Sequence, residues 1–138
     1  INAILNGVIA FFMFRLRDVI PFEEASIDIL ITVGILGSLI SWLGIGSVKG
    51  EIIKGNLSKS KIRGLKLPKG VGIRVAIIMM ICVIGFGGFI VDGGLYLISP
   101  DGLSNWVYIV LKTLYTGAAA AIASWLAILS VLGDENRS

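Results

Sequence analysis

The stretch ILITVGILGSLISWLGIGSV, residues 29 to 48, contains twenty consecutive residues without a charged side chain. An α-helix of about 20 apolar residues crosses a bilayer core of roughly 30 Å. The composition agrees with this, because 56% of the 138 residues are hydrophobic and only 15% are charged, and the mean hydropathy is +0.93. Soluble domains are about half apolar and about a quarter charged. The sequence therefore predicts an integral membrane protein and excludes an ordinary soluble globule.

Two further runs have about the length of a membrane span. Residues 75 to 91 contain no charged side chain over seventeen positions, and residues 113 to 133 contain none over twenty-one. The opening run, residues 1 to 14, corresponds to about 21 Å of helix, which is too short to cross alone. Because the chain starts with Ile inside this run, we expect residues upstream that complete the first span. The predicted helices are therefore at about residues 1–14, 27–48, 73–98 and 103–132.

The runs show none of the alternation of apolar and polar residues that a membrane β-barrel requires over about ten residues of each strand. In lipid, helices are the other structure that pairs every backbone N–H and C=O group. The expected fold is all-α: a polytopic membrane protein in which a single transmembrane domain, residues 1–138, forms an antiparallel bundle of four helices. Small residues at spacings of three and four predict close helix packing, and in the second helix they are Gly34, Gly37, Ser38, Ser41 and Gly44.

Basic residues are concentrated in one connection. Eight of the twelve Lys and Arg residues lie between Lys49 and Arg74, whereas the segment from Arg15 to Asp28 has two Arg against four acidic residues. An excess of Lys and Arg marks the cytoplasmic side of a membrane protein. We therefore predict that the basic loop, residues 49–72, and both termini lie in the cytoplasm, in the plasma membrane of a prokaryote.

The basic loop is expected to lie on anionic lipid, where each Lys or Arg contributes about 1 kcal/mol. The alternative is a docking surface for a cytoplasmic partner. Nucleic-acid binding is not expected, because no aromatic side chain interrupts the loop for stacking on bases. The residues expected to contact lipid or a partner are Lys59, Lys61, Arg63, Lys66 and Lys69.

On the opposite side, Glu23, Glu24 and Asp28 form an external acidic cluster. The segment that carries them is expected to rest on the lipid headgroups as a short amphipathic link. The alternative is an acidic vestibule that gathers cations near a pore. Ser26 and Asp28 also suit the start of the second helix, because Ser caps free N–H groups and acidic side chains favour the positive end of the helix dipole.

Ionisable side chains within a span are costly and are therefore candidate functional residues. Asp92 and Lys112 lie at similar depth, about 10 Å from the outer edge, on helices joined by a short turn. We expect an ion pair across this hairpin; the alternative is that each marks a helix end and extends towards water. Asn2 and Asn6, four residues apart on one helix face, are expected to hydrogen-bond to another helix or to line a polar path.

The chain has no His and a single Cys, Cys82. We therefore expect no metal site, no cofactor and no catalytic residue, and a membrane enzyme ranks third among the function classes. The leading interpretation is a non-enzymatic interaction, accessory or regulatory subunit that packs against copies of itself or against another membrane subunit. The alternative is a small oligomeric transporter or channel whose polar path lies near Asn2, Asn6, Asp92 and Lys112.

Overall fold

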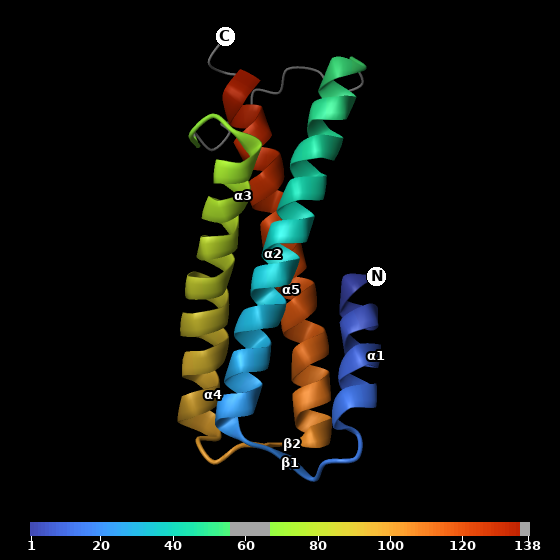
Figure 1. The fold of residues 1–138 in the computed structure, drawn as a ribbon, viewed down its shortest axis with the longest axis vertical. Helices are drawn as coiled ribbons and strands as arrows, with labels where there is room; N and C mark the ends of the chain where they lie inside the picture. Colours follow the sequence, from blue (N-terminus) through green and yellow to red (C-terminus); the bar gives the residue numbers. More distant parts are fainter. Residues whose placement is uncertain (56–66, 136–138) are drawn as a thin grey trace.

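The computed structural model describes residues 1–55 and 67–135 and consists mainly of helices (Figure 1). α3, η1 and α4 follow one another without a break and form one rod. The expected all-helical fold is confirmed. In chain order the elements are α1 (Asn2–Phe14), β1 (Val19–Ile20), α2 (Phe22–Ile53), α3 (Val71–Met80), the π-helix η1 (Ile81–Asp92), α4 (Gly93–Ile98), β2 (Leu103–Ser104) and α5 (Asn105–Glu135).

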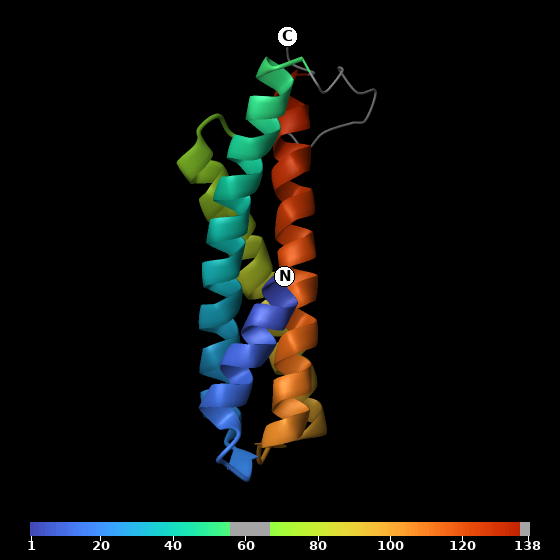
Figure 2. The ribbon, with the colours of Figure 1, turned by 90° about the vertical axis from the view of Figure 1, so that its right-hand side faces the viewer.

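Three rods are long and apolar enough to cross a membrane, namely residues 22–53, 71–98 and 105–132. They lie side by side, with α2 and α5 running in one direction and the α3–η1–α4 rod running in the other (Figures 1 and 2). α1 packs on α5 and covers only the half of the bundle near the strands. With 13 residues, or about 20 Å of helix, α1 is shorter than a span.

α2 is longer at both ends than its apolar run predicts, because it covers residues 22–53 rather than 27–48. Glu23 and Glu24 lie in its first turn, where negative side chains favour the positive end of the helix dipole. Ser26 therefore lies in the second turn, and the predicted helix start beside it is wrong. The length of an apolar run indicates which part of a helix suits lipid, but it leaves the polar ends of the helix unmarked.

Small residues bring the helices into close contact within the chain. A Cβ at Gly7 of α1 would lie 2.5 Å from Thr113 Oγ1 of α5, and a Cβ at Gly44 of α2 would lie 3.1 Å from the Ala127 Cβ of α5. Backbones can approach this closely only where side chains are small. These small residues are therefore used for close packing between helices of the same chain, as their spacing predicts.

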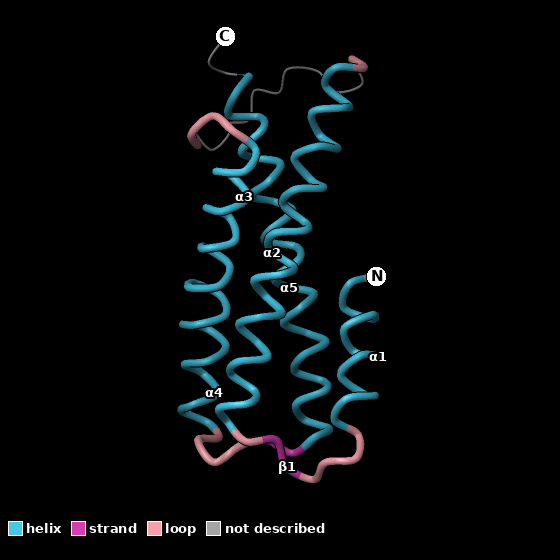
Figure 3. Tube along the Cα trace, in the orientation of Figure 1, coloured by secondary structure: helices cyan, strands magenta, loops and turns pink. Residues whose placement is uncertain are grey.

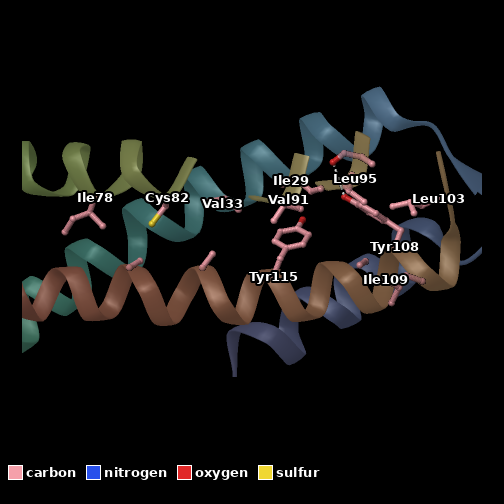
Figure 4. Packing of buried hydrophobic residues seen from close by; sticks show 14 of the residues in the cluster. Ile29, Val33, Ile78, Cys82, Val91, Leu95, Leu103, Tyr108, Ile109 and Tyr115 are labelled. Carbon is pink, nitrogen blue, oxygen red and sulfur yellow. Dashed lines mark hydrogen bonds between the residues drawn. The ribbon is translucent and has the colours of Figure 1, made fainter. Parts of the chain in front are cut away.

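The space between the rods is filled by buried apolar side chains, including Ile29, Val33, Ile78 and Cys82 (Figure 4). Large apolar side chains on the outer faces are exposed instead. Because lipid tails are as apolar as these side chains, such exposure is normal for a bundle inside a membrane. The exposed residues include Leu39, Trp42, Phe89, Leu97, Trp106 and Trp125.

The third rod changes geometry at its centre. Residues 81–92 form a π-helix, in which the hydrogen bonds join residues five apart. This segment contains Gly85, Gly87 and Gly88, and each glycine disfavours an α-helix interior by about 1 kcal/mol relative to Ala. The wider turns end at Asp92, so the face that Asp92 occupies differs from the one that a regular α-helix would give it.

The end of the bundle near the α1–α2 connection is closed by a two-stranded antiparallel ribbon (Figure 3). Val19 of β1 lies opposite Ser104 of β2, and Ile20 lies opposite Leu103. Gly102 precedes β2 with a φ of 122°. A Cβ at this glycine would lie 2.5 Å from the Ile20 carbonyl oxygen, so the position requires glycine. The ribbon ties the two connections at this end together.

Candidate functional site

Charged and hydroxyl side chains meet inside the bundle, near the ribbon end. The Nζ of Lys112 on α5 lies 2.6 Å from Oδ2 of Asp28 on α2. The Lys112 side chain is 3% exposed and the Asp28 side chain is 21% exposed, so the ion pair is largely enclosed by the protein. Removing one partner of a buried pair leaves an uncompensated charge, which destabilises a protein by about 3–5 kcal/mol.

Aromatic side chains surround this ion pair. Tyr108, one turn before Lys112, donates a hydrogen bond to the same Asp28 oxygen, and its hydroxyl lies 3.4 Å from the carbonyl oxygen of Ala25. The Phe14 ring packs edge-on against Tyr108 with the ring centroids 5.1 Å apart. The Lys112 Nζ lies 5.7 Å from the Phe14 ring centroid. Two donors from α5 therefore hold the Asp28 carboxylate, and α1 covers the ammonium group.

Asp92, the last residue of η1, makes a separate polar contact with α2. Ser26 donates a hydrogen bond to Asp92 Oδ2. The other oxygen, Oδ1, is buried and has no hydrogen-bond partner among the described residues. Among those residues, no Lys or Arg forms an ion pair with Asp92. With all three side chains ionised, the two aspartates and Lys112 leave one negative charge uncompensated.

The hydroxyl of Tyr115 on α5 is also buried, and it has no hydrogen-bond partner within the part of the chain that the structure describes. Tyr115 is 4% exposed. Figure 4 shows its ring pointing away from α5 towards Ile29 of α2 and Val91, the residue before Asp92. Two buried polar atoms, Asp92 Oδ1 and the Tyr115 hydroxyl, thus belong to one polar cluster.

The predicted ion pair between Asp92 and Lys112 is wrong, although both residues lie near the same end of the bundle. α2 supplies the partner of each, with Asp28 holding Lys112 and Ser26 holding Asp92. The physical reason is the order of the helices, because α2 packs extensively both on α5 and on the rod that carries Asp92. The alternative that Lys112 extends towards water is also wrong, because its side chain is buried.

The three residues of the predicted external acidic cluster line one open hollow but have different partners. Glu24 forms a salt bridge with Arg17 and Glu23 is exposed, whereas Asp28 turns inward to Lys112. Asp28 therefore belongs to the buried polar cluster as well as to this acidic group, because α2 carries its side chain towards Lys112 of α5. An open hollow of about 450 Å³ is lined by these three acidic residues together with Met13, Phe14, Ile27 and Ile31.

The other predicted residues lie elsewhere. Asn2 is the first residue of α1, and Asn6 is half-buried on the same helix. The contact between Gly7 and Thr113 places this part of α1 level with the turn that follows Lys112. Of the predicted loop residues, Lys69 is exposed, and the structure does not describe Lys59, Lys61, Arg63 and Lys66.

A second hollow, of about 500 Å³, lies on the outer face of α3 and η1 and has an apolar lining. A Cβ at Gly85 in this hollow would meet nothing within 4 Å, so the glycine is not required by a contact within the described chain. We call this hollow the outer recess. Its lining residues are Ile77, Met80, Ile81, Ile84 and Gly85.

The carboxylates of the buried cluster are suited to binding positively charged groups. Asp28 already holds the Lys112 ammonium, and Asp92 retains one buried oxygen without a hydrogen-bond partner among the described residues. In the described residues, no group of three or more His, Cys, Asp or Glu side chains could hold a metal ion. Sequence reasoning missed Tyr108 and Tyr115, although their spacing of four and three residues from Lys112 places all three on one helix face.

Comparisons with protein-family models, with curated proteins and with solved structures found no match in any of the three. The fold and the polar cluster define the chain as an all-helical protein with three helices able to cross a membrane.

Proposed function

We propose that the chain is a non-enzymatic integral membrane protein that acts as an interaction or accessory subunit of a membrane assembly. The outer recess carries this proposal. Helix association in lipid depends on close packing at small residues, because lipid tails remove the hydrophobic driving force between helices. Gly85 is a small residue with open space in front of it, and the surrounding side chains form a concave apolar seat. A helix of a second subunit, or of a second copy of this chain, would pack there.

Exposed tryptophans support the membrane position of the bundle. Trp106 and Trp125 are 19 residues apart on α5, about 28 Å along the helix axis. Trp42 lies level with Trp125, because Gly44 contacts Ala127 two residues further along each parallel helix. Tryptophan favours the two interfaces of a bilayer, whose core is about 30 Å thick. We therefore place the lipid core between these levels, with the polar cluster inside it.

The charges of the described residues support the predicted orientation. The ribbon end carries the exposed acidic residues Asp18, Glu23 and Asp101, together with two exposed basic residues, Arg15 and Arg17. We propose that this end faces outwards, and that the opposite end and both termini are cytoplasmic, in a prokaryotic plasma membrane with anionic lipid along the basic loop. At the opposite end lie Lys49, Lys54, Lys69 and Arg74.

The mass of the complex formed by the full chain in mild detergent tests the subunit proposal. We expect a complex heavier than one chain, and mass spectrometry of its components distinguishes a homo-oligomer from a hetero-complex. Gly85→Leu should fill the outer recess and reduce the complex to single chains. Gly46→Leu is the matched control, because Gly46 on α2 is exposed and also has open space around it. Single chains from the unmodified protein, or equal loss in both variants, would contradict the proposal.

A second candidate function is a small oligomeric transporter or channel. The open hollow that favours it is lined by Glu23, Glu24 and Asp28 and borders the Asp28–Lys112 ion pair. In this proposal the polar path uses Asp92 and Lys112, together with Asn2 and Asn6 of α1. Cation flux into liposomes that contain the purified chain should exceed the flux into empty liposomes and fall in Glu23→Gln. Equal flux into both kinds of liposome would remove this candidate.

A further inference from the structure

We propose that Asp92 and Tyr115 form a binding site for a small monovalent cation, held by Asp92 Oδ1 and the Tyr115 hydroxyl oxygen. This site is independent of the outer recess and of the subunit function proposed for it. It lies inside the bundle, where η1 and α5 both face α2.

The distribution of charge is the first argument for the site. Lys112 neutralises Asp28 at a distance of 2.6 Å, whereas Asp92 has only a hydroxyl donor, Ser26, among the described residues. An uncompensated carboxylate in an apolar interior is costly by several kcal/mol, and buried charges in proteins are paired or bind a cation. A water molecule would satisfy Oδ1 as a hydrogen-bond donor, but it would leave the charge of Asp92 in place. A cation neutralises that charge.

The ligand atoms are the second argument. Within the described chain, Asp92 Oδ1 and the Tyr115 hydroxyl are the buried side-chain polar atoms without a hydrogen-bond partner. Tyr115 is only 4% exposed. Its ring points towards Val91, the residue next to Asp92 (Figure 4). Carboxylate and hydroxyl oxygens are suitable ligands for hard cations.

The charge count selects a monovalent ion. Two carboxylates and one ammonium group leave a single negative charge, which one monovalent cation balances and which a divalent cation would exceed. Divalent ions such as Ca²⁺ also take six to eight oxygen ligands, several of them carboxylates. The described residues contain no group of three or more acidic, His or Cys side chains for such an ion.

Sodium is the probe for this site. The full chain, purified in mild detergent without sodium, is unfolded thermally in rising NaCl and in choline chloride of equal ionic strength. Because a ligand that binds the folded state stabilises it, the midpoint should rise with sodium beyond its rise with choline. Direct binding of radioactive sodium should give one ion per chain. Asp92→Asn should abolish both responses, and Tyr115→Phe should weaken binding by about tenfold.

Asp101→Asn is the matched control, because Asp101 lies in the exposed turn outside the cluster, and this variant should bind sodium normally. Asp92→Asn should fold and should be as stable without sodium as the unmodified chain is with it, because the neutral amide removes the charge. Equal responses to sodium and choline, or sodium binding that persists in Asp92→Asn, would overturn the site. A midpoint that depends on pH and not on sodium would overturn it as well, because a proton would then neutralise Asp92.

Discussion

Lys112 and Asp28 join two parallel helices, α5 and α2, through a salt bridge with the Lys112 Nζ 2.6 Å from Asp28 Oδ2. The bridge has the same register as other contacts between these helices. The Tyr108 hydroxyl reaches the Ala25 carbonyl one turn earlier, and Gly44 and Ala127 meet several turns later. A buried polar contact therefore coincides with the apolar packing that sets how α2 lies on α5.

Lys112→Met should destabilise the protein by about 3–5 kcal/mol, because it leaves the Asp28 charge buried without a partner. Adding Asp28→Asn should recover much of this loss. The free energy of unfolding in mixed micelles, measured for both single variants and the double variant, gives the coupling energy. Lys54→Met is the control, because its exposed bridge to Glu51 contributes about 0–1 kcal/mol. Coupling of Lys112 to Asp92 in place of Asp28 would contradict the structure.

Gly7→Ala should destabilise the contact between α1 and α5 by about 1–3 kcal/mol. The new Cβ would lie 2.5 Å from Thr113 Oγ1, and that hydroxyl is held by a 2.9 Å hydrogen bond to the Ile109 carbonyl. Thr113→Ala should relieve the clash in the double variant. Thermal unfolding of the variants measures both effects. Gly46→Ala, which has open space, should be neutral or stabilising; an equal loss at Gly46 would show that helix contact is not the cause.

Gly102→Ala should loosen the ribbon between β1 and β2. The φ of 122° is unfavourable for alanine, and the Cβ would lie 2.5 Å from the Ile20 carbonyl oxygen, so we expect a loss of about 1–3 kcal/mol. Faster amide hydrogen exchange at Ile20 and Leu103 measures the local opening. Gly94→Ala in α4, where a Cβ meets nothing within 4 Å, should leave these amides unchanged. Unchanged exchange in Gly102→Ala would contradict the geometry of the turn.

The sequence predicts the helices well and their partners poorly. Apolar length alone places the spans, because lipid requires every backbone group to be paired within a helix. It does not say which helix lies beside which. The prediction that Lys112 pairs with Asp92 assumed that helices joined by a short turn are also the closest neighbours at that depth. In the structure α2 takes that place for both residues, and its polar first turns, with Asp28, extend beyond the apolar run.

The π-helix η1 is a second feature that the sequence does not predict. The glycines of η1 indicate a weak α-helix. Hydrogen bonds between residues five apart, however, depend on the packing of the whole bundle and leave no periodic signal in the sequence. Asp92 closes this segment, so its face could not be deduced from a period of 3.6. The place of Tyr108 and Tyr115 in the polar cluster can be predicted, because both share a helix face with Lys112.

The proposed orientation predicts which end of the bundle reacts with a reagent added outside the cell. With Cys82 replaced by Ala, a cysteine at Asp101 should react in intact cells with a maleimide that does not cross membranes. A cysteine at Lys69 should react only after the cells are permeabilised, because we propose that the basic side of the protein faces the cytoplasm. Both positions are exposed, so accessibility within the protein does not limit either reaction. Labelling with the opposite pattern would reverse the proposed orientation.

The most direct test of the proposed subunit function is photocrosslinking from the outer recess in native membranes. A photoreactive amino acid at Met80, which lines the recess, should give one discrete protein adduct. The same amino acid at Leu39 is the control, because Leu39 is an exposed residue of α2 at similar depth, two residues beyond the contact of Gly37 with Met79. The proposal predicts a protein adduct from position 80 and lipid adducts from position 39. Lipid adducts from both positions would contradict it.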